Sequence, residues 1–376
     1  MKVRLGNYIN EYSVRNKNDE NIPVYSVTNT KGFCRDYFGK EVASKDKTTY
    51  KIVPRGYFAF NPSRINVGSV DWQRNEDRVI VSPLYNVFSV SPQLDQQYLY
   101  YYLKSDFVLQ RIRAVATGSV RDNLKLAMLY EFPIRLPSIE RQKEMAERLD
   151  KVKNVIALRE QEYQRLDELI KARFVEMFGD PVSNPKGWEK KALSDEAEIK
   201  IGPFGSLLHK EDYIAGGHAL VNPSHIVDGK ILPDDKLTVS DEKYDELSAY
   251  HLRIGDVVMG RRGEMGRCAV VEQVGLLCGT GSLLIRTNGD LSADYIQKII
   301  SFPSFKRIIE DMAVGQTMSN LNVPIVSSFQ IIKPPKSVQD QYYAFVAQVD
   351  KSKAVIQKSL EEAQLLFDSL MQQYFG

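Results

Sequence analysis

Cysteine, histidine and long apolar runs are all scarce in this 376-residue chain. The 3 cysteines, Cys34, Cys268 and Cys278, have neither the spacing of a disulfide framework nor that of a zinc site, so we expect buried free thiols. The 4 histidines form no HExxH pair and have no cysteine nearby, so no metal site is expected. No apolar run approaches the ~20 residues of a membrane-spanning helix. With no signal-peptide pattern after Met1, we expect a cytoplasmic protein.

Sequence motifs of catalysis are missing as well. There is no GxxxxGK[ST] phosphate loop, which gives no reason to expect ATP binding. Residues 260–266 are rich in glycine, but their spacing favours a β-turn over a nucleotide site. Asn61-Pro62 and Asn222-Pro223 share only two residues with the Asn-Pro-Pro-aromatic motif of amino-methyltransferases and are interpreted as Asx-Pro turns. We therefore predict no catalytic residue, no metal and no cofactor in this chain.

The sequence contains an internal duplication. Three pairs of segments match: 54–57 with 253–256, 118–124 with 315–321, and 175–179 with 372–376. The matched glycines lie 199, 197 and 197 residues apart (Gly56 to Gly255, Gly118 to Gly315, Gly179 to Gly376). Solenoid repeats have periods of about 20–50 residues, so this is a duplicated domain. Two copies of one domain suit a target that itself has two parts.

Charge is divided unequally between the two halves. Lysine and arginine number 20 against 13 aspartates and glutamates in residues 1–137, and 17 against 20 in residues 181–335. The counts are nearly balanced in 138–180 (9 against 10) and in 336–376 (4 against 5). Only the first half carries the positive charge expected of a nucleic-acid-binding domain, so the second would have to rely on local basic clusters.

The sequence pattern of each half predicts an α+β domain followed by a long helix. β-Branched and aromatic residues predict strands in 50–60, 78–90, 255–259, 267–271 and 282–286, and short strands end at the prolines of 132–137 and 329–335. Helices are predicted over 95–108 and 293–312. We predict four parts: a globular domain at 1–137, a helix at 138–180, a second globular domain at 181–335 and a second helix at 336–376.

The hydrophobic period of the two long helices alternates between four and three residues, which is typical of a coiled-coil seam. The predicted seam is Met145, Leu149, Val152, Ile156, Tyr163, Leu166 and Ile170 in the first helix and Val349, Ile356, Leu360, Ala363, Phe367 and Leu370 in the second. Arg159 and Lys353 interrupt it, as polar positions that set the register or as partner contacts. A helix of about 40 residues is about 60 Å long. Because either apolar stripe alone would face water, we predict an antiparallel coiled coil.

Two loops at equivalent positions combine glycine with hydrogen-bonding side chains. The candidates for DNA contact in them are Ser119, Arg121, Asn123 and Lys125 in the first and Thr317, Ser319 and Asn320 in the second. Arginine can pair with guanine, asparagine with adenine, and hydroxyl groups with bases or phosphates. The alternative is a glycine helix cap followed by a polar turn. A capping turn can also contact DNA, so both interpretations stay open.

A second candidate cluster follows the first predicted strand of each half. Its members are Asn61, Ser63, Arg64 and Asn66 in the first half and Arg261, Arg262 and Arg267 in the second, with Lys210 as a further cation. Solvated hairpin turns are the alternative. The tyrosines at 98 and 100–102 could stack on bases, but their helical context favours packing in the core.

The order of domain, helix, domain, helix resembles the specificity subunit of type I restriction-modification systems over essentially the whole chain. The similarity rests on the Gly-Asn/Ser-Leu loops, the helix entries LPSIERQKEMAERLD and PPKSVQDQYYAFVAQVDK, the Phe-Gly-Asp-Pro and Tyr-Phe-Gly helix ends, and IPVYSVTNTKGF and GYFAFNPSRINVGSV in the first half.

The resemblance implies a subunit without catalytic activity. Each recognition domain would read one half of a bipartite, asymmetric DNA site, and the paired helices would set the spacing and dock two methyltransferase subunits. S-adenosylmethionine, ATP and Mg²⁺ would bind to the modification subunits and to restriction subunits that cleave DNA. A two-headed coiled-coil scaffold that does not bind DNA is the competing interpretation. The sequence does not reveal which bases would be read, because docking geometry and DNA shape decide which side chain meets which base.

Overall fold

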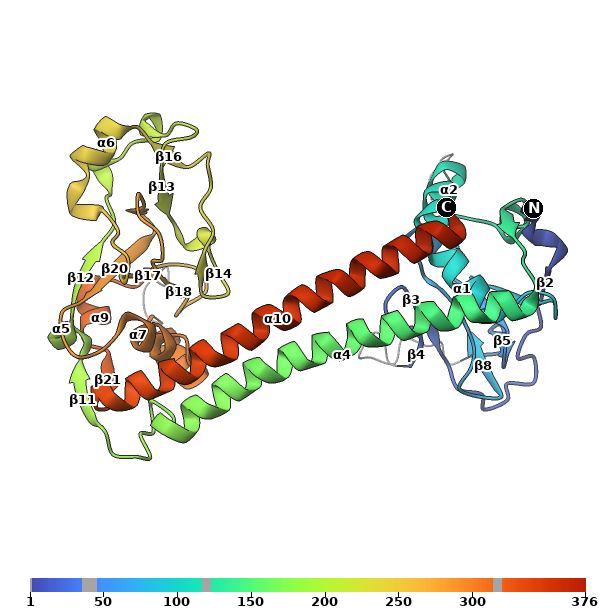
Figure 1. Cartoon of the computed structure of the whole chain (residues 1–376), viewed down its shortest axis with the longest axis horizontal. Coiled ribbons are helices and arrows are strands. Elements are labelled where there is room, and N and C mark those ends of the chain that lie inside the picture. Colours follow the sequence, from blue (N-terminus) through green and yellow to red (C-terminus); the bar gives the residue numbers. More distant parts are fainter. Residues whose placement is uncertain (1, 36–45, 117–122, 314–319) are drawn as a thin grey trace. The chain divides into compact units, whose positions relative to one another are not determined.

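The computed structural model describes residues 2–35, 46–116, 123–313 and 320–376, and the chain forms two compact units (Figure 1). Unit 1 contains residues 1–163 and 354–376, and unit 2 contains residues 164–353. Each unit therefore combines one globular part with a section of each of two long helices. Within the described residues, no helix is both long and apolar enough to cross a membrane.

Unit 1 is built on a four-stranded antiparallel sheet in the order β2-β9-β6-β7, from strands Ile9–Glu11, Asn86–Val90, Phe58–Phe60 and Val70–Trp72. Three two-stranded antiparallel sheets accompany it: β1 (Lys2–Arg4) with β10 (Pro133–Arg135), β3 (Ser26–Thr28) with β4 (Gly32–Cys34), and β5 (Lys51–Pro54) with β8 (Arg78–Val81). The strand predicted over 50–60 is divided, because Gly56 has a positive φ of 83° and turns the chain between β5 and β6.

The helices of unit 1 are α1 (Gln96–Lys104), α2 (Asp106–Ala116) and α3 (Leu126–Tyr130). The single helix predicted over 95–108 is interrupted at Ser105, whose Oγ accepts a hydrogen bond from the backbone N–H of Val108 at 3.4 Å and so caps α2. The α1 tyrosines at 98, 101 and 102 are at most 2% exposed, which confirms the core interpretation for these three.

Unit 2 repeats this plan. Its main antiparallel sheet has the order β12-β20-β17-β18, from strands Ala197–Ile201, Ser282–Thr287, Val257–Gly260 and Cys268–Val270, and β11 (Glu189–Ala192) pairs with β21 (Gln330–Lys333) as β1 does with β10. The additional strands are β13 (His218–Val221), β16 (Thr238–Val239), β19 (Leu277–Cys278), β14 (Ile226–Val227) and β15 (Lys230–Ile231). β13 pairs in parallel with β19. The duplication seen in the sequence is thus also a duplication of strand order.

The helices of unit 2 are α5 (Leu193–Glu196), α6 (Asp241–Glu246), α7 (Ala293–Ile300), α8 (Pro303–Ala313) and α9 (Val323–Ser327). The helix predicted over 293–312 is divided between α7 and α8, because α8 begins at Pro303. Proline has no backbone N–H to donate, so it suits the first position of a helix and interrupts a longer one.

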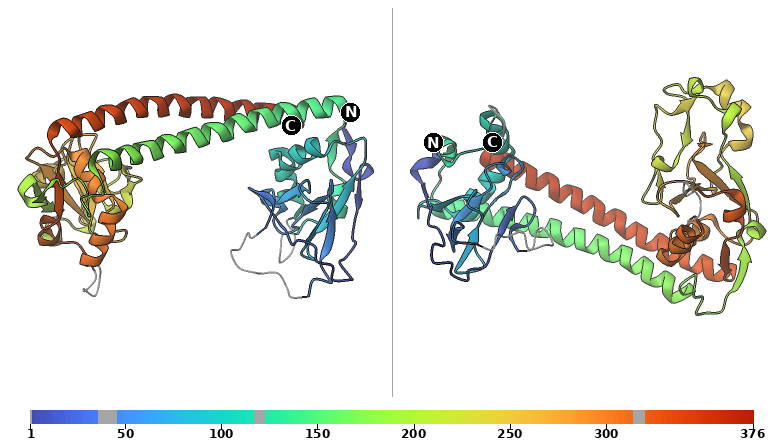
Figure 2. Two further views of the ribbon diagram at one scale, coloured as in Figure 1. Left: turned by 90° about the horizontal axis from the view of Figure 1, so that it is seen from below. Right: turned by 180° about the vertical axis from the view of Figure 1, so that it is seen from behind.

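The two long helices are α4 (Ile139–Phe178) and α10 (Lys336–Phe375), and they lie side by side in antiparallel directions (Figure 2). In unit 1 the end of α10 joins the core that contains the start of α4, and the ring of Phe375 lies 5.1 Å from that of Tyr98. In unit 2 the end of α4 meets the start of α10, where Phe178 packs against Tyr342 at 5.3 Å. These contacts establish the antiparallel coiled coil.

Burial along both helices follows the four-three period. Of the seam residues, Met145, Leu149, Ile170 and Val349 are at most 8% exposed, and the others are half-buried. Polar residues also occupy the seam. Lys353 forms an ion pair of 2.7 Å with Asp167 on the opposite helix, whereas Arg159 pairs with Glu162 of its own helix at 2.6 Å. Lys353 therefore connects the two helices of unit 2 directly.

Each long helix is joined to a globular part by one fully buried glutamine, Gln142 in α4 and Gln339 in α10. Gln142 accepts a hydrogen bond from the N–H of Asp95 at 2.9 Å and donates to the carbonyls of Gln93 and Pro137 at 3.0 and 2.9 Å. In unit 2, Gln339 accepts from the N–H of Ser292 at 3.2 Å and donates to the carbonyls of Asp290 and Pro334. Asp95 and Ser292 cap α1 and α7, so Gln142 fixes α4 to the start of α1 and Gln339 fixes α10 to the start of α7.

Candidate nucleic-acid interface

In unit 1, the two candidate clusters meet at the end of β6. The N–H of Leu124 donates to the carbonyl of Pro62 at 3.1 Å, which places Asn123 and Lys125 beside the loop of residues 61–66. In this loop, Asn61 Oδ1 accepts hydrogen bonds from Ser63 N and Oγ at 3.1 and 2.9 Å, which confirms the predicted Asx turn. The side chain of Leu124 is fully buried and anchors the junction.

Unit 2 forms the same junction at the end of β17. The N–H of Leu321 donates to the carbonyl of Arg261 at 3.0 Å, and Arg261 Nε donates to the carbonyl of Leu321 at 2.9 Å. Leu321 is also fully buried. In both halves, therefore, a buried leucine connects the segment after the glycine-containing loop to the loop that follows the central strand.

The candidate side chains differ in how much of their surface is accessible. Those exposed to solvent are Ser63, Arg64, Asn123, Lys125, Lys210 and Arg262. The half-buried ones are Asn61, Asn66, Arg261, Arg267 and Asn320. Ser119, Arg121, Thr317 and Ser319 lie outside the described residues. The accessible cations at these junctions are therefore Arg64 and Lys125 in unit 1 and Arg262 in unit 2.

The three arginines of unit 2 have different environments. Arg267 donates to Glu264 from Nη2 at 2.7 Å and to the carbonyl of Pro223 from Nη1 at 3.2 Å. Burial, with a smaller contribution from neighbouring Arg262, lowers the pKa of Arg261 from its ordinary value. Arg262 makes no ion pair with any residue in the described part of the chain. Arg261 and Arg267 thus use their guanidinium groups to hold loops together, and Arg262 is available for an external anion.

The segment that contains Lys210 is linked to the unit 2 junction by Tyr213, whose backbone N–H donates to the carbonyl of Lys210 at 3.4 Å. Burial raises the pKa of Tyr213, and a hydrogen bond with Thr280 opposes this shift. The next residue, Gly281, accepts a hydrogen bond through its carbonyl from the N–H of Arg261 at 2.9 Å. The segment after β12 is therefore linked to the loop of Arg261, although it lies about 50 residues away in the sequence.

Residues that sequence reasoning did not select also lie at these junctions. A small cavity of about 40 Å³ in unit 1 is lined by Ser26, Val27, Thr28, Asn29, Asn61, Arg64, Ser69 and Tyr85. In unit 2, Asn222 Oδ1 accepts a hydrogen bond from the N–H of Gly281 at 3.4 Å. The repeated Asn-Pro-Ser at 61–63 and 222–224 was the available signal for Asn222, and Asn29 lies in the segment IPVYSVTNTKGF that carries part of the family resemblance.

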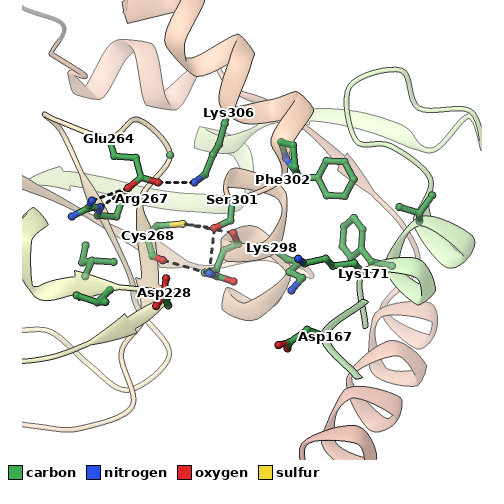
Figure 3. A pocket seen from close by; sticks show the side chains of 18 of the residues that line it. Asp167, Lys171, Asp228, Glu264, Arg267, Cys268, Lys298, Ser301, Phe302 and Lys306 are labelled. Carbon is green, nitrogen blue, oxygen red and sulfur yellow. Dashed lines mark hydrogen bonds and ion pairs between the residues drawn. The ribbon is translucent and has the colours of Figure 1, made fainter. Parts of the chain in front are cut away.

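A larger cavity of about 1220 Å³ lies in unit 2 between the end of α4, the β14–β15 turn, α7 and the start of α8 (Figure 3). Three of its charged groups are engaged with one another, since Glu264 accepts from Lys306 at 3.1 Å and from Arg267. Burial raises the pKa of the Cys268 thiol to about 12, so this sulfur is protonated at neutral pH and is a poor nucleophile.

The described residues contain no group of three or more His, Cys, Asp or Glu side chains suited to hold a metal ion. What the geometry does provide is two similar loop junctions, each on its own α+β domain and each rich in hydrogen-bonding groups. Such an arrangement defines a protein with two similar α+β domains, each packed against sections of two long helices.

Comparisons with known proteins agree with this class. The family model of the type I restriction modification DNA specificity domain matches residues 2–168 and again residues 185–365. The chain therefore belongs to the type I restriction-modification specificity family and carries two copies of its DNA specificity domain.

Two relatives and two solved structures are similar to it. Both relatives are from Methanocaldococcus jannaschii. The type I restriction enzyme MjaVIII specificity subunit is 30% identical over 21% of this chain and 18% of its own length. The MjaIX specificity subunit is 23% identical over 73% of this chain and 67% of its own length. A chain from a study of assembly and conformational transition of the type I R-M system has a TM-score of 0.66 at 18% identity, covering 100% of this chain and 97% of that one. The M. genitalium S subunit has a TM-score of 0.57 at 15% identity, covering 100% and 96%.

Proposed function

We propose that this chain is the non-catalytic subunit that gives a type I restriction-modification complex its DNA sequence specificity. Each recognition domain reads one half of a bipartite, asymmetric site in double-stranded DNA. The observation that carries the proposal is the pair of equivalent junctions, Leu124 with Pro62 and Leu321 with Arg261, because each presents polar and basic groups from two loops at the same edge of a duplicated domain. The two junctions differ in side chains, which supports two different half-sites.

We also propose that α4 and α10 set the distance between the half-sites and dock two methyltransferase subunits. The exposed faces of both helices, rich in charged residues and glutamine, provide a surface for such partners. S-adenosylmethionine, ATP and Mg²⁺ are then bound by the modification and restriction subunits, and the complex works in the cytoplasm.

The test is to map N6-methyladenine in a methylation-free host that carries this chain with its neighbouring methyltransferase, against a host without this chain. The expected result is a new motif of two short blocks around a gap of fixed length. Replacing residues 1–137 with the matching domain of another family member is expected to change one block only. If both proteins associate and no motif is found, the proposal fails.

The competing function is a coiled-coil scaffold that does not bind DNA. Affinity for a random duplex over a series of salt concentrations separates the two, because a DNA-binding protein loses affinity steeply as salt rises and a scaffold has no such affinity to lose.

A further inference from the structure

Three cationic side chains of unit 1 surround the ring of Tyr100. The guanidinium of Arg74 and the ammonium groups of Lys104 and Lys153 lie 5.7, 5.2 and 5.4 Å from the ring centroid. Lys153 Nζ also donates to the Tyr100 hydroxyl at 3.3 Å, and Arg74 covers the ring of Trp72 at 4.4 Å. We call Trp72, Arg74, Tyr100, Lys104 and Lys153 the Tyr100 cluster. It brings together β7, the loop after it, α1 and α4.

Negative charge around the cluster is insufficient to neutralise it. Asp71 accepts a hydrogen bond from Arg74 at 2.5 Å and others from the N–H groups of Phe33 and Trp72. Asp150 accepts from the Tyr101 hydroxyl and from Gln97 at 2.5 and 2.8 Å.

In the described part of the chain, the two lysines of the cluster have no carboxylate partner. Lys104 donates instead to the carbonyl of Asn29 at 2.8 Å. Within the described chain, neither Lys104 nor Lys153 forms an ion pair with a carboxylate.

The proximity of these cations affects Lys104. Burial, against the opposing effect of Asp71 and together with the smaller effects of the Lys153 and Arg74 charges, lowers the pKa of Lys104 to about 8. An anion placed among the three cations would relieve their mutual repulsion and favour the charged form of Lys104.

The cluster is specific to the first half of the chain. α1 and α7 begin at Gln96 and Ala293, and α4 and α10 begin at Ile139 and Lys336, so equivalent positions in both helix pairs are 197 residues apart. At that offset, Tyr100, Lys104 and Lys153 correspond to Gln297, Ser301 and Asp350. The second half therefore has neutral or acidic residues where the first has its cations.

The cluster is continuous with the candidate interface of the same unit. Asn29, whose carbonyl accepts from Lys104, also lines the small cavity that contains Asn61 and Arg64. A surface of basic groups thus runs from Arg64 past Asn29 to Lys104 and Lys153, and so reaches the long helix α4.

We propose that the Tyr100 cluster binds a phosphate group of the DNA backbone beside the half-site read by unit 1, so that α4 itself contributes a DNA contact through Lys153. This inference rests on the proposed function, since it requires DNA on the face of Arg64. Lysine and arginine contacts to phosphates position a protein on the duplex without reading its sequence.

The test measures the affinity of the full chain, in complex with its methyltransferase partner, for a random duplex over a series of KCl concentrations. Each lost phosphate contact reduces the slope of log K against log salt by about 0.9. We expect part of this decrease for Lys153→Gln and the full decrease of about 0.9 for Lys104→Gln/Lys153→Gln, in which the phosphate loses both lysines. The matched control is Lys143→Gln/Lys151→Gln, which removes the same charge from exposed positions of α4 and is expected to leave the slope unchanged.

Lys104 also provides a pH test. In the protein without DNA, Lys104 loses its proton as the pH rises above its pKa of about 8. Binding of the phosphate requires the charged form, so the proton must then be taken up again on binding. The affinity for DNA therefore falls as the pH rises through this value. Between pH 8 and pH 9 we expect about a fivefold greater loss of affinity in the unchanged protein than in Lys104→Arg, whose guanidinium stays charged.

The results separate this inference from the proposed function. If the unchanged complex shows no salt-dependent DNA binding, the proposed function fails. If it binds DNA but Lys153→Gln leaves the slope as it was, only the phosphate site is wrong. Lys153 is exposed, so its replacement tests the site even if Lys104→Gln impairs folding. A loss of assembly with the methyltransferase at unchanged slope would overturn the inference in favour of a protein partner.

Discussion

Single buried residues determine how each domain is attached to its long helix. Gln142 and Gln339 are both 0% exposed and make the same three kinds of hydrogen bond in the two units. A buried amide side chain is stable only when its polar atoms have partners, and its partners are unsatisfied when it is removed. The two glutamines therefore belong to the framework that holds the loop junctions on each domain.

We expect Gln142→Leu to lower the free energy of unfolding of unit 1 by about 2 kcal/mol, because the N–H of Asp95 and the carbonyls of Gln93 and Pro137 lose a buried partner. Scanning calorimetry measures the effect. The control is Gln161→Leu at an exposed position of α4, where little change is expected. Equal thermal stability of both variants would show that Gln142 does not anchor the helix.

At the scale of elements, the two long helices explain why each unit needs residues from distant parts of the sequence. The core of unit 1 includes Leu149 of α4 and Phe375 of α10, and the core of unit 2 includes Phe174 of α4 and Tyr342 of α10. The largest hydrophobic cluster of each unit therefore includes sections of both helices. The coiled coil is thus part of each domain as well as a connection between them.

The contribution of a leucine of α4 to the stability of the protein should depend on how deeply its side chain is buried. Leu149 is 0% exposed and Leu158 is 59% exposed. We expect Leu149→Ala to lower the free energy of unfolding by about 3 kcal/mol, since it opens a cavity in the core. Leu158→Ala is expected to lower it by less than about 0.5 kcal/mol. Urea denaturation of both variants checks this. Similar losses would contradict the assignment of Leu149 to the core and of Leu158 to the surface.

At the scale of the whole molecule, positive charge is concentrated in the first half, where residues 1–137 carry 20 basic and 13 acidic residues. The structure adds a distinction within the second half, where Arg261 and Arg267 are engaged in loop contacts and Arg262 is accessible. We therefore expect the first domain to contribute most of the salt-sensitive binding to DNA.

Neutral replacement of basic residues tests this division. Arg64→Gln and Arg121→Gln are each expected to weaken DNA binding and to reduce the salt slope by about 0.9. Lys17→Gln, an equal change of charge at an exposed site, is the control. Methylation of the cognate site serves as a second measurement. If methylation continues unaltered in both arginine variants, these loops are not the DNA contacts.

Much of the candidate site was accessible from sequence because the duplication marked equivalent loops. The matching segments 118–124 and 315–321 pointed to residues near Leu124 and Leu321, and the structure joins both leucines to the second cluster. Asn29 and the Tyr100 cluster were not accessible in this way. Their members come from separate elements, and no spacing in the sequence shows that Lys104 donates to Asn29 or that Lys153 of α4 reaches Tyr100.

The sequence by itself determined the duplicated α+β plan, the two long helices and their seam, because these features depend on periodicity and on local turn residues. Tertiary structure decided what local patterns cannot encode: the interruptions at Ser105 and Pro303, the burial of Gln142 and Gln339, and the sharing of both helices between two cores. It also separated arginines that hold loops from arginines that face solvent. The physical reason is that availability of a charge depends on which distant groups surround it, and only the folded chain brings those groups together.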